Sequence, residues 1–312
     1  MTDNLSGKID KAKRVIKLAA AMSKEYYGKP LIICYSGGKD SDVLLDIAIK
    51  SGAEIEVVNS HTTADAPETV YHIRNVFKRL RGGGIEATEL KPTYKGKPVS
   101  MWSLIPQKQY PPTRIARYCC SILKEASTPN RIVAVGVRED ESIGRRGRGE
   151  FTMRGKTKKY ALNFTLNHAE EVYQESHEYG DAFDCTLITR MKQNADVVVN
   201  PIYEFSELDI WKYIAINGVD VCELYERGYR RVGCIGCPFA GRETREKEFD
   251  DFPAYKKMYI HAFDRMLCEM DKHGKDHAWK SGQEVFDFWI SGESATKPKQ
   301  MSIQDYIRSD DD

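Results

Sequence analysis

The sequence contains no apolar run long enough to cross a bilayer, no internal repeat and no low-complexity tract. Residues 18–22 are apolar, but the stretch is too short for the core of a secretory signal, and polar residues follow it. We therefore expect a soluble cytoplasmic protein, whose eight cysteines serve a purpose other than disulfide bonding because cytosolic thiols stay reduced. Net charge is also nearly absent, with 47 Lys and Arg against 46 Asp and Glu, so it neither indicates nor excludes a polyanionic partner.

The most informative feature present is the segment Ser-Gly-Gly-Lys-Asp-Ser at residues 36–41. Residues 31–35 before it form an apolar run typical of a buried parallel strand, and residues 42–49 after it have apolar side chains at helical spacing. Two glycines allow a tight turn, and the N–H groups of the first helical turn converge on one point. Since the side chains of residues 36, 39 and 41 add further donors, the segment predicts a phosphate site. Its spacing is not that of a Walker A loop.

Strands and helices alternate along much of the chain, which predicts an α/β fold with a parallel twisted sheet flanked by helices. A chain of 312 residues is long enough to bury the core of such a fold. Helices are expected over residues 9–26 and 67–80. The predicted strands are 31–35, 54–59, 85–90, 131–137 and a fifth in either 184–189 or 197–199. Ligands in such sheets bind at the carboxyl ends of the strands, so we expect three segments to lie close together. They are 36–41, 61–63 with Glu68, and 136–138.

We predict a nucleotide-binding α/β domain over residues 1–220, a cysteine-loop and helical region over 221–290, and a peripheral tail over 291–312. A long helix is expected over 253–273. Residues 145–180 form a polar insert that does not follow the alternation of strands and helices. Basic side chains gather at its start, namely Arg138, Arg145, Arg146, Arg148, Arg154, Lys156, Lys158 and Lys159. Such a loop suits the phosphates of a nucleotide or a nucleic-acid backbone, and a solvated surface loop is the alternative.

Four of the cysteines occur in two pairs, the adjacent Cys119 and Cys120 and a distant Cys-x-x-Cys formed by Cys234 and Cys237. A Cys-x-x-Cys turn directs two thiolates at one point, and the proline that follows is typical of iron–sulfur loops. Four thiolates suit either a 4Fe-4S cluster or structural zinc. Neighbouring cysteines tend to diverge, which a cluster tolerates better than one tetrahedral zinc, so we favour the cluster; unligated thiols are the third interpretation. The other cysteines at 34, 185, 222 and 268 are expected to be structural.

Residues 36–41 resemble the signature of the PP-loop ATP pyrophosphatases, which cleave ATP between the α- and β-phosphates, adenylate a substrate and release pyrophosphate. The order Cys-Cys and then Cys-x-x-Cys resembles the cluster-binding cysteines of the adenylyl-sulfate and phosphoadenylyl-sulfate (PAPS) reductase family, which has the same kind of fold. Further segments look like parts of that family, namely 61–69, 136–142, 200–202, 209–214 and 225–242. The resemblance covers most of the chain, from residue 28 to residue 270.

Two features depart from the reductases proper. Their phosphosulfate loop differs from residues 36–41, and they carry a nucleophilic cysteine on a C-terminal tail, whereas here no cysteine follows Cys268. Because a thiol attack needs an accessible, activated thiolate, both departures favour a branch that uses ATP itself. Similar proteins with an ATP loop and four cysteines include the Dnd-type DNA phosphorothioation proteins and cluster-dependent tRNA thiolation enzymes.

The resemblance implies a role for each residue that matches the motifs. The ATP-binding candidates are Ser36, Gly37, Gly38, Ser41, His61, Thr62 and Gly136. The catalytic candidates are Lys39 to neutralise charge, Asp40 to orient Mg²⁺, and Arg138 to stabilise charge at the α-phosphate. Asp40 has a structural alternative as the N-cap of the helix, and Glu141 is expected only to pair with a nearby arginine. The metal ligands are Cys119, Cys120, Cys234 and Cys237.

The expected reaction is adenylation of an oxygen with loss of pyrophosphate, followed by sulfur transfer onto an acceptor such as nucleic acid. The resemblance implies a cysteine desulfurase as the sulfur donor. Two alternatives stay open. The first is reduction of PAPS or adenylyl sulfate with release of sulfite, which needs Cys222 or Cys268 to reach the substrate. The second is a non-catalytic nucleotide- or nucleic-acid-binding module.

Overall fold

The structure is a computed structural model of the chain, and it describes residues 5–125, 130–141, 145–154, 161–179 and 196–291. The chain forms two compact units. The first comprises residues 1–59, 67–90 and 128–232, and the second comprises 60–66, 91–127 and 233–312. In the described ranges, no helix has both the length and the apolar composition that a membrane crossing requires. The predicted tail lies outside the described residues, apart from residue 291.

The first unit is built on a seven-stranded sheet in the order β3-β2-β1-β6-β9-β7-β8. Strand β1 pairs in parallel with β2 and β6, and β6 pairs in parallel with β9, whereas β7 is antiparallel to both β9 and β8. The strands are β1 (Leu31–Cys34), β2 (Ile55–Ser60), β3 (Ala87–Leu90), β6 (Ile132–Ala134), β7 (Phe151–Arg154), β8 (Ala161–Phe164) and β9 (Asp196–Val199). This mostly parallel sheet, flanked by helices, confirms the predicted fold class.

The central strands follow the sequence prediction: β1 and β6 are shorter than expected, and β2 is shifted by one residue. Strand β1 is a run of apolar residues because it is buried on both faces, and its Ile33 lies opposite Val57 of β2 and Ala134 of β6. The fifth predicted strand is β9, at the second of the two expected positions. The first position, 184–189, lies outside the described residues, as does Cys185.

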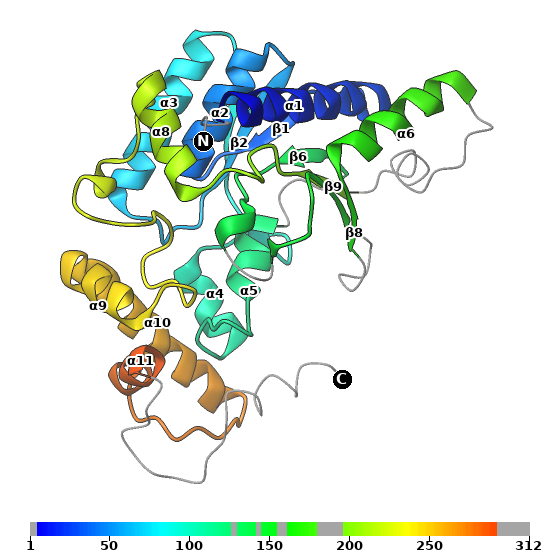
Figure 1. Ribbon diagram of the computed structural model, residues 1–312. Coiled ribbons are helices and arrows are strands. Elements are labelled where there is room, and N and C mark those ends of the chain that lie inside the picture. Colours follow the sequence, from blue (N-terminus) through cyan, green and yellow to red (C-terminus); the bar gives the residue numbers. More distant parts are fainter. Residues whose placement is uncertain (1–4, 126–129, 142–144, 155–160, 180–195, 292–312) are drawn as a thin grey trace. The chain divides into compact units, whose positions relative to one another are not determined.

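Helices cover one face of this sheet (Figure 1). They are α1 (Leu5–Tyr27), α2 (Lys39–Ser51), α3 (Pro67–Gly82), α6 (Leu166–Tyr179) and α8 (Glu207–Asn217). Ile16 of α1, Leu44 of α2 and Phe77 of α3 share one buried cluster with Ile33 of β1. Residues of the opposite face of the sheet form a smaller buried cluster of Ile32, Val58, Val133 and Val198. Both predicted helices are therefore confirmed, as α1 and α3.

No strand was predicted in the polar insert over 145–180, yet its described part contains two. Strands β7 and β8 form an antiparallel hairpin that extends the main sheet beyond β9, with Phe151 opposite Val199. Phe151 and Met153 of β7 are fully buried in the main core, and α6 follows the hairpin. Strand β7 is short and has basic and glycine residues around it, so its two buried apolar positions were too few to be recognised as a strand pattern in the sequence.

Helix α8 begins with a capping box, and one of its residues also bonds to α1. Ser206 and Asp209 exchange side-chain-to-backbone hydrogen bonds, and the Asp209 carboxylate accepts a hydrogen bond from Lys8 at 2.6 Å. Burial alone would raise the pKa of Asp209, but the hydrogen bonds from Lys8 and Ser206 outweigh it and lower that pKa. The charged carboxylate therefore stabilises the folded state.

We expect Asp209→Asn to lower the free energy of unfolding by about 1 kcal/mol at neutral pH. A lowered folded pKa gives stability that is present above the unfolded value, about pH 3.9, and is lost as pH falls through the folded value. The difference between wild type and variant should therefore be constant near neutrality and shrink below about pH 4. Urea unfolding at a series of pH values measures it. A difference that grows in acid would contradict this account.

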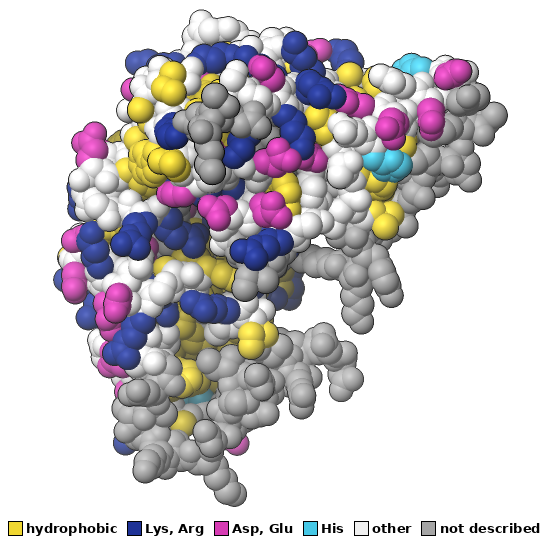
Figure 2. Space-filling view, viewed as in Figure 1, with side chains coloured by type: hydrophobic (Ala, Val, Ile, Leu, Met, Phe, Trp, Pro, Cys, Tyr) yellow, Lys and Arg dark blue, Asp and Glu magenta, His cyan; other side chains and the backbone are white. Residues whose placement is uncertain are grey.

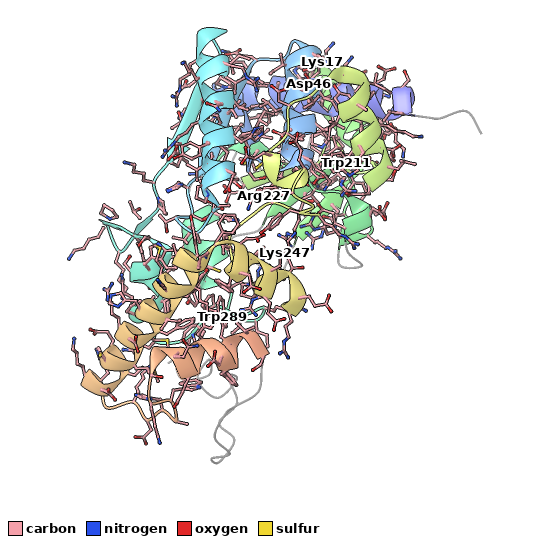
Figure 3. The ribbon with its side chains drawn as sticks, turned by 90° about the vertical axis from the view of Figure 1, so that its left-hand side faces the viewer. Lys17, Asp46, Trp211, Arg227, Lys247 and Trp289 are labelled. Atoms are coloured by element: carbon pink, nitrogen blue, oxygen red, sulfur yellow. The ribbon has the colours of Figure 1, made fainter. Side chains whose placement is uncertain are left out.

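The second unit is mainly helical. Its helices are α4 (Met101–Lys108), α9 (Arg242–Asp251), α10 (Pro253–Lys272) and α11 (Gly282–Ser291), so the long helix predicted over 253–273 is confirmed as α10. Trp289 of α11 holds the group together (Figure 3): its ring contacts Tyr259 and Phe263 of α10, and its indole N–H donates to the carbonyl of Pro112 at 2.7 Å. Aromatic packing of this kind stabilises each pair beyond its area of burial.

Candidate functional site

The glycine turn between β1 and α2 has the geometry of an anion site. Gly37 has φ +74°, and a Cβ there would lie 2.8 Å from the side chain of Ile73, so both conformation and space require glycine. Helix α2 begins at Lys39, and its N-cap Gly38 supplies no side-chain cap, so its first-turn N–H groups are open to other acceptors; that of Lys39 donates to the hydroxyl of Tyr225 at 2.9 Å. Ser41 donates to the Gly38 carbonyl at 2.7 Å and shapes the turn, whereas Ser36 is exposed.

Arg138, which follows β6, reaches the first turn of α2. Its Nε donates to Asp40 Oδ1 at 2.6 Å, and its side chain is only 4% exposed. Lys39 is equally buried, with its Nζ 3.3 Å from Asp40 Oδ2. The N-cap alternative for Asp40 is wrong, because Gly38 is the N-cap and the carboxylate faces two cations instead. The structure therefore brings together the three predicted catalytic residues.

Gly136 lies against the same helical turn. A Cβ at this position would lie 3.1 Å from the backbone carbon of Asp40 and 3.3 Å from the backbone nitrogen of Ser41, so a side chain here would be crowded against the backbone of the helix. The predicted proximity of segments 36–41 and 136–138 is thus observed. The contacts of these residues with ATP stay predictions.

Glu207, the first residue of α8, was not singled out in the sequence. Its Oε2 accepts from Arg138 Nη2 at 2.6 Å, and its Oε1 lies 3.3 Å from Lys39 Nζ. The side chain is 50% exposed. Glu207 belongs to no recognisable sequence motif. It lies far from Lys39 and Arg138 in the sequence, and only the fold brings the three residues together.

Arginines gather around this site. Burial lowers the pKa of Arg145, and the positive charges of Arg148, Arg231 and Arg138 lower it further. Glu141 pairs with Arg145, as expected from the sequence. On the face drawn in Figure 2, Lys and Arg side chains are interspersed with Asp and Glu, in keeping with a net charge of +1. The positive charge is therefore local, and it comes from arginines at the carboxyl end of β6 and in the described part of the insert.

His61 and Thr62 directly follow β2 and belong to the second unit. Thr62 is buried, and its hydroxyl donates to Asp65 at 2.6 Å while Cys234 Sγ lies 3.3 Å away. Thr62 therefore lies beside the cysteine loop. His61 is half-buried. Their predicted contacts with ATP stay predictions.

The two cysteine pairs both belong to the second unit, and the segments that carry them pack together. Cys119 and Cys120 lie in a single helical turn, α5 (Tyr118–Cys120). Cys234 pairs through its backbone with Asp65, and Arg114 donates to the carbonyl of Pro238 at 2.8 Å. All four thiols are half-buried, as the exposure of each residue shows.

The thiols interact electrostatically with one another. A hydrogen bond with Cys120, followed by burial and by the charges of the other three thiols, raises the pKa of Cys119. The same hydrogen bond, aided by Lys124 and Arg117, lowers the pKa of Cys120 to about 6 although burial opposes it. Burial raises the pKa of Cys234 to about 12. Among the described residues, no group of three or more His, Cys, Asp or Glu side chains is arranged to hold a metal ion. The four-cysteine centre therefore stays a prediction, although four clustered thiols are a donor set that suits an iron–sulfur cluster or zinc.

The other described cysteines, which were expected to be structural, differ in burial. Cys34 lies in β1, Cys222 is fully buried, and Cys268 lies on α10 with its side chain exposed. Burial raises the pKa of Cys222, so its thiol is a poor nucleophile.

Comparison with known sequences identifies a family and several relatives that match most of the chain. The profile of the phosphoadenosine phosphosulfate reductase domain matches residues 30–240. An uncharacterised protein of Methanocaldococcus jannaschii is 22% identical over 309 residues, covering 96% of this chain and 62% of the relative. An adenosine 5'-phosphosulfate reductase of Anoxybacillus flavithermus is 21% identical over 222 residues, covering 68% of this chain and 74% of the relative. The chain spans 62% and 44% of the length of two curated relatives from Methanocaldococcus jannaschii.

Solved structures also resemble the chain. An FMN adenylyltransferase of Candida glabrata, in complex with FMN and an ATP analogue, aligns with 99% of this chain and 84% of its own at a TM-score of 0.45 and 12% identity. A U34-tRNA thiolase of Methanococcus maripaludis with its 4Fe-4S cluster aligns with 94% of this chain and 86% of its own at a TM-score of 0.41 and 13% identity. Because both scores are low, we draw no conclusion about function from them.

Proposed function

The chain belongs to the phosphoadenosine phosphosulfate reductase domain family, and on that premise we propose that it is an ATP-using PP-loop enzyme. It cleaves ATP between the α- and β-phosphates, joins AMP to an oxygen of an acceptor and releases pyrophosphate. Sulfur then takes the place of the adenylated oxygen, which leaves as part of AMP. A cysteine desulfurase is the proposed donor, a thiol reductant supplies the two electrons that bring its persulfide sulfur to sulfide, and nucleic acid is the proposed acceptor. In character the enzyme is closest to the Dnd-type phosphorothioation branch.

The observation that carries this proposal is the placement of Arg138 and Lys39 at the first turn of α2. The N–H groups at a helix start attract phosphate, and two buried cations beside them neutralise the charge of a polyphosphate. In this assignment Ser36, Gly37, Gly38 and Ser41 surround the pyrophosphate portion. Arg138 stabilises the charge that develops at the α-phosphate, since catalysis of such transfers is largely electrostatic. Asp40, a hard oxygen ligand, would orient Mg²⁺ on the phosphates.

We assign Cys119, Cys120, Cys234 and Cys237 as the ligands of a 4Fe-4S cluster, with zinc as the less favoured occupant. Thiolates suit both, and the hydrogen bond with Cys119 lowers the pKa of Cys120, which favours its thiolate form. When bound, such a cluster would supply electrons or hold the two cysteine segments together, because four cysteine ligands leave no iron open. Arg117 and Lys124 offset the negative charge of the thiolates, as their effects on Cys120 indicate.

The arginines near Arg145 support a polyanionic acceptor. A nucleic-acid backbone and a small phosphorylated metabolite both fit that charge. A footprint of the protein on DNA and on tRNA tests the proposal, and protection of either should weaken steeply as salt is raised. The absence of protection on both at low salt would redirect the acceptor to a small molecule.

One assay tests the reaction itself. Anaerobically purified protein is incubated with labelled ATP or with labelled PAPS, in each case with Mg²⁺, a thiol reductant and a candidate acceptor. Pyrophosphate from ATP supports the proposal, sulfite from PAPS or adenylyl sulfate supports reduction, and binding of ATP without either product supports a non-catalytic module. The relative named as an adenosine 5'-phosphosulfate reductase is the reason to test reduction. The burial of Cys222, with its raised pKa, argues against that residue as the attacking thiol.

A further inference from the structure

The start of α2 already has an oxygen bound to it. The backbone N–H of Lys39, the first residue of the helix, donates to the hydroxyl of Tyr225 at 2.9 Å. A Cβ on Gly38 would lie 3.5 Å from the same oxygen, so the hydroxyl faces the turn directly. Burial raises the pKa of Tyr225, which keeps the phenol neutral. A neutral hydroxyl oxygen thus occupies the place where the helix start attracts a phosphate oxygen.

The cations beside the turn also have an anion bound to them. Both oxygens of Glu207 are used, Oε2 by Arg138 at 2.6 Å and Oε1 by Lys39 at 3.3 Å and by the indole N–H of Trp211 at 3.2 Å. A carboxylate that bridges a guanidinium and an ammonium presents the same pattern of charge and acceptors as a phosphate group.

Trp211 joins these two contacts into one assembly (Figure 3). Its ring meets that of Tyr225 edge to face, with centroids 5.5 Å apart, while its N–H bonds to Glu207. The ammonium of Lys39 lies 5.6 Å from the Tyr225 ring and 6.0 Å from the Trp211 ring, within the range of cation–π attraction. Glu207 and Trp211 lie on α8, and Tyr225 lies in the turn Glu223–Tyr225 that follows it.

We propose that Glu207 and Tyr225 are internal stand-ins for two different phosphates, which the nucleotide must displace. This inference rests on the proposed function. Glu207 marks the α-phosphate subsite, because it occupies Arg138. Tyr225 marks the pyrophosphate subsite, because it occupies the N–H at the start of α2. Glu207 is half exposed, and a rotation of its side chain frees Arg138 without any movement of the helix. Glu207 compensates the two cations, and Tyr225 satisfies the N–H of Lys39, until a polyphosphate arrives.

Removing each stand-in should change the affinity for a different fragment of ATP. In Glu207→Gln the competing charge is removed, so AMP and ATP should bind roughly tenfold more tightly, whereas pyrophosphate should bind as in wild type. In Tyr225→Phe the competing hydroxyl is removed and the ring is kept, so pyrophosphate and ATP should bind roughly three- to tenfold more tightly and AMP should not. Isothermal titration of ATP, AMP and pyrophosphate with Mg²⁺ into the full chain measures all three.

Matched controls lie just before α8 and on it. Glu204→Gln removes an exposed carboxylate that pairs with Lys11, and Tyr213→Phe removes a hydroxyl on α8 that bonds to Asp46; neither should change any of the three affinities. Glu207→Asp keeps the charge and should stay close to wild type. In turnover, Glu207→Gln should lower KM for ATP with little change in kcat, because Glu207 no longer contacts Arg138 once ATP is bound. A structural role alone would not lower KM.

A fluorescence measurement supplies a readout independent of affinity. ATP should change the tryptophan emission of wild type, and most of that change should disappear in Trp211→Phe. Unchanged or weaker AMP binding by Glu207→Gln, or tighter AMP binding by Tyr225→Phe, would overturn the inference while leaving the proposed function intact. A wild-type protein that binds neither ATP nor pyrophosphate would instead refute the proposed function, and the inference with it.

Discussion

Replacing Arg138 by Met should lower the rate of pyrophosphate formation from ATP by about 10²- to 10³-fold, which is the typical loss when one preorganised donor to a developing charge is removed. The side chain is almost fully buried and its Nε bonds to Asp40, so the guanidinium is held in one orientation before the substrate arrives. Arg138→Lys should recover only part of the rate, because an ammonium lacks the fork of the guanidinium and cannot bond to Asp40 and to a phosphate oxygen in the same geometry.

The loss should fall mainly on kcat. The helix start and Lys39 remain in Arg138→Met, so ATP binding by titration should change much less than turnover. Arg14→Met is a suitable control, since Arg14 forms an exposed pair with Glu170 on the same unit and touches none of the site residues described above. Thermal unfolding of each variant separates a loss of catalysis from a loss of folding. A folded Arg138→Met protein with a wild-type rate would remove Arg138 from the mechanism.

The glycine turn between β1 and α2, which is the predicted phosphate site and is here called the phosphate turn, was predictable because it depends on neighbouring residues in the sequence. Gly37 needs a positive φ, and the residues before and after the turn have the patterns of a strand and a helix. All the residues that determine this strand–turn–helix segment are therefore consecutive in the sequence. The meeting of residues 36–41 with Arg138 was predictable for a different reason: in a parallel sheet, the segments after neighbouring strands leave by the same edge, and β1 pairs with β6.

Other contacts were not predictable, because they depend on where distant segments fold. Glu207 and Tyr225 reach the turn from α8 and from the 3₁₀ turn that follows it, and nothing around either residue distinguishes it from other surface glutamates and tyrosines. Strand β7 was missed because glycine and basic residues around Phe151 and Met153 obscured their alternation. The start of α2 at Lys39 also changed the role of Asp40, since a shift of one or two residues turns a cap into a first-turn side chain that faces Arg138.

Replacing any one of the four paired cysteines by serine should remove the predicted cluster from anaerobically purified protein. We expect Cys234→Ser to lower the iron content from about four atoms per chain to below about one and to abolish the visible thiolate-to-iron absorption. Hydroxyl oxygen is a poor substitute for a thiolate ligand to iron, and the remaining thiols are held in place by the fold. Sulfur transfer should be lost, whereas ATP binding should be retained, because the phosphate turn belongs to the other unit.

Cys268→Ser is the matched control, since this thiol is exposed on α10 outside the two pairs. Its iron content and absorption should equal those of wild type. About one zinc and no iron per wild-type chain would favour the structural-zinc interpretation, because one tetrahedral ion uses four thiolates. Wild-type protein that holds neither metal, even after anaerobic reconstitution with iron and sulfide, would contradict the four-cysteine centre. In that case the low pKa of Cys120, hydrogen-bonded by Cys119, would instead mark a reactive thiol, which alkylation near neutral pH would detect.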